Sequence, residues 1–252
     1  MVPVAHATSR SQRLSDLLNR IDYKLAETEA DKEVIYRLRY RAYRHEGAVQ
    51  PNAEHKISDR FDDAPNSWII GVYFDGELAS SLRISVSSPE HPVSPSVNVF
   101  PDLLDAEVAQ AKVMVDPTRF VGDPVRENRF PELPYMTLRL AYIACEHFNA
   151  DIGLASVRAE HQAFYRRVFL HRPISTPRVY PGLTKPICLM AVDYPAMREK
   201  VFARYPYFRS SQFERRMLFD RASRHDSAAG VLATDATRDA ERITLQPGQN
   251  VR

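Results

Sequence analysis

A tyrosine and a histidine lie one helical turn apart within one motif, Val157-x-x-x-His161-x-x-Phe164-Tyr165-Arg166-Arg167-x-Phe169. Phenol and imidazole groups both transfer protons in enzymes. A phenol also has a pKa close enough to that of a thiol for proton transfer between the two at a positioned site. His161 is spaced to orient Tyr165 or to carry a proton itself. The alternatives are a packed helix aromatic and a structural histidine.

A second candidate group combines two carboxylates with an arginine. Asp59 and Asp62 flank Phe61 in a polar segment, and Arg83 occupies the middle of a predicted strand. The side chain of Arg83 points to the face opposite its two apolar neighbours, because side chains alternate along a strand. A charge in a central strand needs a partner. Arg83 therefore pairs with Asp59 or Asp62, or it binds a substrate carboxylate through its planar fork. The alternative for the two acids is a solvated loop.

Arginine dominates the basic residues, since only six of the 34 are lysine. Arg39 and Arg41 point to different faces of the first predicted helix, so one of them can face a substrate while the other is solvated. Four more arginines form a basic group that suits an acidic partner: Arg166, Arg167, Arg172 and Arg178. The net charge is only +2, which does not indicate nucleic-acid binding.

The elements that position these residues follow from periodicity and turn signals. Strands are predicted at 23–26, 67–74, 77–85, 109–115, 152–157 and 186–193, with a further short one near Val179. Helices are predicted after the capping box at Thr28–Asp31, over 134–148 and over 160–169. An Asp75-Gly76 turn joins two of the strands as a hairpin. The order predicts an α/β (α+β) fold whose mixed central sheet carries helices on both faces.

The ends of the chain lack a sustained period. We expect a flexible segment over 1–21, one folded domain over 22–220 with a C-terminal helical arm, and a disordered tail over 221–252. The opening residues carry no secretory signal, and no run of about 18 apolar residues occurs, so a cytoplasmic location without a membrane span is expected. Cys145 and Cys188 have no metal-type spacing and are expected to be buried thiols, and no metal site is predicted.

The same residues, in this order of elements, resemble the GCN5-related N-acyltransferase (GNAT) superfamily. More narrowly, they are similar to the bacterial-type N-acyl amino acid synthases of the FeeM kind, which are relatives of the acyl-homoserine-lactone synthases. The resemblance covers residues 23–194. It rests on four places: Arg37-Leu-Arg39-Tyr-Arg41-Ala-Tyr43, Asp59-x-Phe61-Asp62, Leu82-Arg83, and the motif around Tyr165.

The resemblance implies the acyl-CoA N-acyltransferase-like fold, in which two parallel strands splay apart and bind a pantetheine arm. Here those strands would be 109–115 and 152–157. It further implies transfer of an acyl group, long-chain here, from a thioester to the amine of an amino acid. Tyr165 would protonate the departing thiolate, with His161 and Asp62 as further catalytic residues. The implied substrate-binding residues are Arg39, Asp59, Phe61, Arg83, Lys112, Val113 and Val115, and the four clustered arginines would dock an acyl carrier protein.

Two departures from the family pattern qualify this picture. The superfamily binds the pyrophosphate of acetyl-CoA at a glycine-containing turn, whereas 126–134 here contains no glycine. This favours an acyl carrier protein over acyl-CoA, and acyl-phosphopantetheine is then a co-substrate with no permanently bound cofactor. Relatives also carry a Glu-x-Ser-Arg-like segment on the fourth strand. In 110–116 Lys112 would stand for its basic residue, and the acid is missing unless Glu107 replaces it.

Three other functions remain open. An acyl-homoserine-lactone synthase would use S-adenosylmethionine, and a short-chain acetyltransferase would use acetyl-CoA. A non-catalytic module would bind acyl carrier protein or lipid, an interpretation that the missing acid supports.

Overall fold

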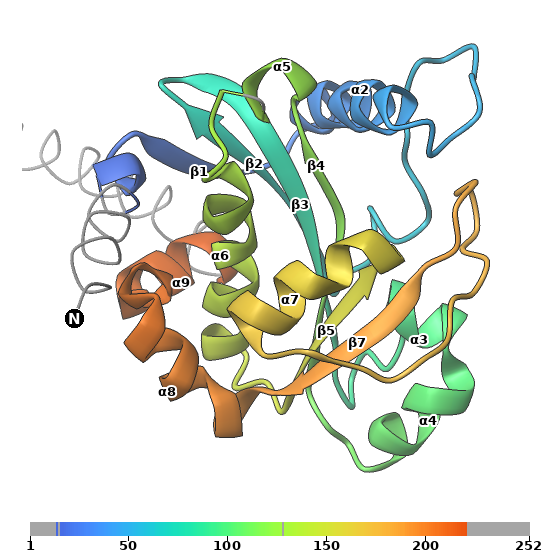
Figure 1. Ribbon diagram of the computed structural model, residues 1–252, viewed down its shortest axis with the longest axis vertical. Coiled ribbons are helices and arrows are strands. Elements are labelled where there is room, and N and C mark those ends of the chain that lie inside the picture. Colours follow the sequence, from blue (N-terminus) through green and yellow to red (C-terminus); the bar gives the residue numbers. More distant parts are fainter. Residues whose placement is uncertain (1–13, 15, 128, 221–252) are drawn as a thin grey trace, which may run out of the picture.

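The computed structural model describes residues 14, 16–127 and 129–220 (Figure 1). The strands are β1 (Ile21–Leu25), β2 (Ser67–Phe74), β3 (Glu77–Ser87), β4 (Met114–Gly122), β5 (Ile152–Val157), β6 (Arg172–Pro173) and β7 (Cys188–Asp193). The helices are α2 (Glu29–His45), α3 (Pro95–Val99), α4 (Pro101–Ala109), α5 (Pro124–Glu127), α6 (Leu133–His147), α7 (Gln162–Phe169), α8 (Tyr194–Arg204) and α9 (Gln212–Phe219). Two short 3₁₀ turns, η1 (Ala159–His161) and η2 (Pro206–Phe208), precede α7 and α9.

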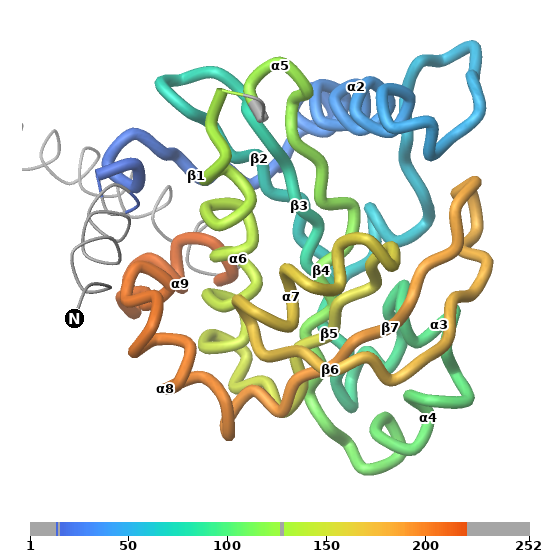
Figure 2. The backbone as a smooth tube through the Cα atoms, in the orientation of Figure 1, coloured from blue at the N-terminus to red at the C-terminus, as the bar shows by residue number. Residues whose placement is uncertain are grey.

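The strands form one sheet in the order β1-β2-β3-β4-β5-β7-β6, with β1 and β6 at opposite edges (Figure 2). Among the strands of the described residues, β4 and β5 pair in parallel and all other neighbours are antiparallel. Asp75 and Gly76 both have positive φ, 51° and 81°, as a tight β-hairpin turn requires. Thr28 and Asp31 form the predicted capping box at the start of α2. These local predictions are confirmed, as is the mixed α/β fold.

Helices cover both faces of the sheet. Leu82 and Ile84 of β3 face α6 in the main core, and α7, α8 and α9 pack on this side (Figure 1). Arg83 faces the other side, where α2, α3 and α4 lie. The alternation along β3 therefore separates an apolar face under α6 from a charged face under α2.

The fourth strand lies further along the chain than predicted. Residues 101–109 form helix α4, and β4 begins at Met114 and continues through Asp116-Pro117 to Gly122. The prediction ended the strand at this dipeptide because proline has no N–H to donate. A proline is tolerated where no neighbouring strand needs its N–H. Residues 118–122, which follow the predicted strand, also belong to β4. Helix α3 lies between β3 and α4, in a region where the sequence analysis placed no element.

The folded part also begins earlier than residue 22. Leu14 is 2% exposed and packs in the main core, and Arg20 forms an ion pair with Asp75. The expected C-terminal arm is present as α8, η2 and α9. Arg139 of α6 binds it through the backbone carbonyls of Tyr207 and Arg209 and through the Glu214 carboxylate. Residues 1–13 and the tail predicted over 221–252 lie outside the described residues.

Candidate active site

The parallel strands β4 and β5 pair over only two positions, Met114 with Ile152 and Val115 with Gly153. The N–H of Ile152 donates to the carbonyl of Val113, so odd-numbered residues of β4 direct their backbone groups toward β5. The next such residue is Pro117, which has no N–H. The ladder stops there, while β4 stays paired with β3 on its other side. The predicted splay is therefore present, and the two strands separate after the pair formed by Val115 and Gly153.

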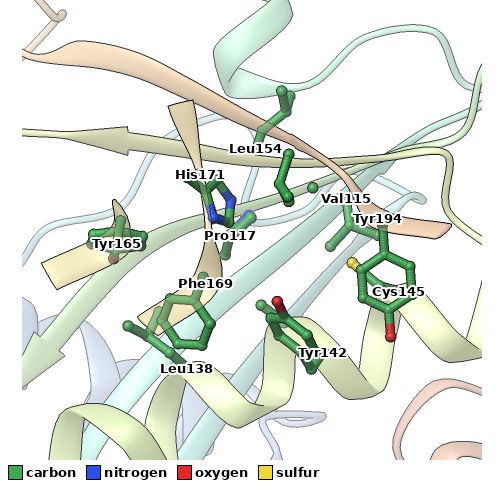
Figure 3. A pocket seen from close by; sticks show the side chains of 13 residues that line it. Val115, Pro117, Leu138, Tyr142, Cys145, Leu154, Tyr165, Phe169, His171 and Tyr194 are labelled. Carbon is green, nitrogen blue, oxygen red and sulfur yellow. The ribbon is translucent and has the colours of Figure 1, made fainter. Parts of the chain in front are cut away.

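An apolar cavity lies at this splay, under α6 and α7 (Figure 3). Its walls come from both strands, both helices and the β6–β7–α8 edge: Val115, Pro117, Leu138, Ala141, Tyr142, Cys145, Gly153, Leu154, Tyr165, Phe169, His171, Val192 and Tyr194. The cavity volume is about 20 Å³, room for about one water molecule. Side chains must therefore move before anything larger can enter.

Tyr165 of α7 is 8% exposed and lines this cavity. Burial raises the pKa of its phenol, so the hydroxyl stays protonated at neutral pH. Within the described part of the chain, no hydrogen bond engages this hydroxyl. A protonated, unengaged phenol in an apolar cavity can donate to a substrate atom.

His161 lies at the start of α7 on the protein surface. Its Nε2 is 2.7 Å from Nη2 of Arg158, which also forms an ion pair with Glu46. Desolvation and the Arg158 guanidinium both lower the pKa of His161. Its imidazole is absent from the described residues that line the cavity, so the structure does not bring it to the Tyr165 hydroxyl.

On the opposite face, Asp62 forms the centre of a buried ion-pair cluster. Arg39 Nη1 lies 2.9 Å from both carboxylate oxygens of Asp62, and Arg83 Nη1 lies 3.0 Å from Oδ1. The backbone N–H of Asp59 donates to Oδ2. Arg39, Asp62 and Arg83 all have completely buried side chains. Asp62 is thus placed to hold the segment 59–62 against α2, out of reach of a substrate amine.

Asp59 lies at the outer edge of this cluster, with its side chain 24% exposed. It binds Arg83 on one side and Arg119 on the other, where Nη2 lies 2.6 Å from Oδ2. Burial alone would raise the pKa of Asp59, but the two guanidinium groups outweigh it and hold the pKa well below its usual range. Phe61 lies under the guanidinium of Arg83. Three arginines thus share two carboxylates, which leaves one surplus positive charge beside the splay.

A β-bulge turns Arg119 toward Asp59. Arg119 has φ 55°, and the register with β3 shifts between Ser81 and Arg83. Such a bulge places two successive residues against one on the partner strand and re-aims a side chain. A positive φ is costly for a residue other than glycine, so the surrounding structure must hold it.

The bulged strand also contains a segment whose residue types follow the same order as the family pattern that 110–116 lacked. Asp116-Pro117-Thr118-Arg119 has the order acid, any residue, hydroxyl, arginine, in the manner of Glu-x-Ser-Arg. The expectation that Lys112 supplies the basic residue of this pattern stays a prediction. Lys112 precedes β4 and pairs with Glu107, at the paired end of the two strands rather than at the splay.

Asp116 lies fully buried beside the gap between β4 and β5. Its carboxylate accepts hydrogen bonds from the backbone N–H and the hydroxyl of Ser96, and that hydroxyl contacts Ser156 of β5 at 2.8 Å. Burial raises the pKa of Asp116, and the bonds from Ser96 offset this only in part. Tyr180 adds a phenol to this side of the gap. Burial raises the pKa of this phenol, and the negative charges of Asp116 and Asp59 raise it further.

The backbone groups of Val113 and Val115, predicted to hold the substrate, are engaged with β5. The Val113 carbonyl accepts from Asp151 and Ile152, its N–H donates to the Asp151 carboxylate, and Val115 belongs to the last paired position. Free backbone groups can therefore occur only beyond this point.

Three of the four arginines in the predicted basic group are exposed, and the fourth is held in an ion pair. Arg166 and Arg167 on α7 and Arg172 on β6 are exposed, whereas Arg178 forms a two-point ion pair with Asp102. The start of α6 offers little to a pyrophosphate. The N–H groups of Leu133, Tyr135 and Met136 already donate to backbone carbonyls, and Pro134 has none.

Four residues of the site were not predicted: Asp116, Arg119, His171 and Tyr180. The acid-x-hydroxyl-arginine order could have indicated Arg119 had it been sought after Val115. His171 follows α7 in a segment without periodicity, and no sequence signal marked it. Among the described residues, no group of three or more His, Cys, Asp or Glu could hold a metal ion. No helix in this part of the chain is long and apolar enough to span a bilayer.

Comparison with known proteins agrees with this geometry. The family model for the N-acyl amino acid synthase FeeM matches residues 34–193. No curated protein sequence matches the chain.

Solved structures of similar fold include FeeM, an N-acyl amino acid synthase from uncultured soil microbes. It has a TM-score of 0.61 and 14% identity, covering 73% of this chain and 97% of that chain. The CoA-dependent acyl-homoserine-lactone synthase BjaI, solved with SAM and isopentyl-CoA, has a TM-score of 0.53 and 14% identity, over 75% and 89%. A second CoA-dependent synthase of this kind, MesI, has a TM-score of 0.50 and 18% identity, over 76% and 97%. At these identities the likeness establishes the acyltransferase fold.

Proposed function

Because the chain belongs to the family of the N-acyl amino acid synthase FeeM and is an N-acyltransferase, we propose that it transfers a long-chain acyl group from acyl carrier protein to the amine of an amino acid. The observation that carries the proposal is the splay of β4 and β5 beside a cavity lined by Tyr165. An unpaired gap between strands accepts an extended pantetheine arm, and the apolar walls suit an acyl chain.

In the proposed reaction, the neutral amine nitrogen attacks the thioester carbonyl carbon and forms the C–N bond. The C–S bond then breaks, and the Tyr165 hydroxyl protonates the thiolate. The proton released by the nitrogen returns to Tyr165 through solvent, so that one proton passes in sum from nitrogen to sulfur. The acyl chain enters the cavity by displacing its side chains, since the cavity is narrow without it.

The acceptor side is proposed to be the charged face. The surplus positive charge of the cluster formed by Arg39, Arg83, Arg119, Asp59 and Asp62 favours the carboxylate of an amino acid. The exposed edge of Asp59 is placed to bind its ammonium group. Asp116 lies on the same side of the gap, and its carboxylate, with a pKa raised by burial, is the group available to take the proton of the ammonium.

The carrier protein is favoured over CoA because the first turn of α6 has its amides already bonded. A carrier brings a single phosphate and an acidic surface, which suits the exposed Arg166, Arg167 and Arg172. We expect Arg166→Glu with Arg167→Glu to raise the KM for acyl carrier protein about tenfold or more, and to leave the KM for acyl-pantetheine unchanged. Lys24→Glu on the distant strand β1 is the control. Equal KM effects on both donors would contradict carrier docking at α7.

The function itself is tested with purified protein, acylated carrier proteins of graded chain length and the common amino acids. Product is read by mass spectrometry and thiol release in parallel. We expect an N-acyl amino acid from a long-chain donor. Two further assays use S-adenosylmethionine as the acceptor and acetyl-CoA as the donor. Turnover in only one of these assays would replace the proposal with an acyl-homoserine-lactone synthase or an acetyltransferase, respectively. Absence of transfer from every donor would favour a binding module instead.

A further inference from the structure

A thioester bound at the splay needs a hydrogen-bond donor for its carbonyl oxygen, which becomes negatively charged as the amine attacks. The backbone of β4 does not provide one where it would be expected. Odd-numbered residues of β4 face β5, and the first beyond the paired part is Pro117, which has no N–H. Its position on the cavity wall leaves that side without an amide donor.

The cavity has few side chains that can take this role. Five of its residues carry polar or thiol groups: Tyr142, Cys145, Tyr165, His171 and Tyr194. The Tyr194 hydroxyl donates to Glu146. Tyr142 packs against Tyr194 with a ring-centroid distance of 5.4 Å, whereas the ring of His171 lies 5.9 Å from that of Tyr165 (Figure 3). His171 is thus the polar neighbour of the proposed proton donor.

The imidazole of His171 is available and uncharged. The residue is 7% exposed, and its Nδ1 has no hydrogen-bond partner within the described part of the chain. Burial lowers the pKa of His171 to about 4, although the carbonyls of Phe169, Leu154 and Gly153 partly offset this. A neutral imidazole carries one N–H and can donate it without losing its proton.

The proton is best placed on Nε2. Nδ1 is completely buried without a partner, and a buried unpaired N–H costs more than an unpaired acceptor. Nε2 lies 3.8 Å from the point that a Cβ on Gly153 would occupy. Since Gly153 lines the cavity at the last paired position of the splay, Nε2 faces the space where a thioester would lie.

We propose that His171 is a catalytic residue whose Nε2–H donates a hydrogen bond to the thioester carbonyl oxygen, in place of the backbone amide that Pro117 removes. The inference rests on the proposed acyl transfer. His171 keeps its proton throughout, while Tyr165 protonates the sulfur one bond away from the same carbonyl carbon. A ring separation of 5.9 Å allows both side chains to contact one thioester group.

The test compares His171→Gln, which keeps an N–H near the place of Nε2, with His171→Leu, which has none. Loss of one oxyanion donor costs about 10²- to 10³-fold in kcat. We therefore expect this loss in His171→Leu, at least a tenfold recovery in His171→Gln, and the same KM for the acyl donor in both. A thioether analogue without the carbonyl should bind wild type and both variants equally. His171→Phe replaces His171→Leu if the latter does not fold.

The outcomes separate the two proposals. Wild-type turnover with His171→Leu within threefold of it would overturn the role of His171 and leave the acyl transfer intact. Equal losses in folded His171→Leu and His171→Gln would also overturn it, because the N–H would then not matter. A wild-type protein that transfers no acyl group from any thioester would overturn the proposed function, and the role of His171 with it.

Discussion

Arg39 and Asp62 face each other with both side chains fully withdrawn from solvent, and Nη1 of the arginine lies 2.9 Å from each carboxylate oxygen. Together with Arg83 on β3, this pair ties the segment 59–62 to α2 and to the sheet. The segment carries Asp59, the acid at the edge of the proposed acceptor site. A pair that is structural in itself therefore positions a residue of the proposed acceptor site.

Replacing Asp62 should lower the stability of the fold and not only the rate of the reaction. Removing one partner of a buried ion pair costs about 3 kcal/mol or more, because the other charge stays buried without compensation. We expect Asp62→Asn to lower the free energy of unfolding by about this amount in urea titrations. The neighbouring Asp63→Asn is the matched control, because Asp63 is 74% exposed and its pair with Lys32 is worth at most about 1 kcal/mol. Similar losses in the two variants would contradict the structural role.

Tyr165→Phe should remove the proton donor without disturbing the fold. The hydroxyl is buried and has no hydrogen bond within the described residues, so its loss should leave the melting temperature within about 2 °C. General acid catalysis contributes about 10²- to 10⁴-fold, and kcat should fall by at least about 10²-fold. Burial raises the pKa of Tyr165, so kcat in wild type should not decline up to about pH 10 through loss of this proton. Tyr205→Phe controls for loss of a phenol elsewhere. A Tyr165→Phe variant that keeps a third of the wild-type kcat would exclude the role.

Gly153 lies where the two strands separate, and a side chain there would narrow the cavity. A Cβ would lie 3.0 Å from Cγ1 of Val192 and 3.9 Å from Sγ of Cys145. We expect Gly153→Ala to lower kcat/KM for long-chain donors about tenfold or more, by analogy with the cost of one misplaced methyl group in a packed core. Val192→Ala in the same chain removes the closest contact and should restore most of the loss. No change in Gly153→Ala would mean that the acyl group does not pass this point.

The lowered pKa of His171 predicts an acid-sensitive fold. The unfolded chain binds the proton near pH 6.5, whereas the folded protein resists it until about pH 4. Stability is therefore complete above pH 6.5 and is lost as the pH falls toward 4, by about 3 kcal/mol. Relative to His171→Gln, wild type should lose this amount in denaturant titrations between pH 7 and pH 4. The tyrosines and the cysteine around His171 have raised pKa values and do not titrate in this range. A constant difference between the two proteins would contradict a buried neutral imidazole.

Local sequence signals determined much of the fold. The Asp75-Gly76 hairpin, the capping box at Thr28 and the placement of Arg83 opposite the apolar face each depend on a few neighbouring residues. Backbone conformations and side-chain alternation are set at that range, so the sequence alone is sufficient for them. The part of the Tyr165 motif that forms α7, residues 162–169, belongs to the same class, since it occupies one short helix.

Only the tertiary structure decided where β4 lies and what meets at its open end. A proline ends a strand where a neighbouring strand needs its N–H, and it can lie within a strand where none does. Pro117 lies within β4, because the pairing of β4 with β5 has already ended at Val115. Arg119 reaches Asp59 through a bulge against β3, and His171 reaches the cavity from a segment without a pattern. These placements depend on pairings between residues far apart in the chain, which local periodicity does not encode.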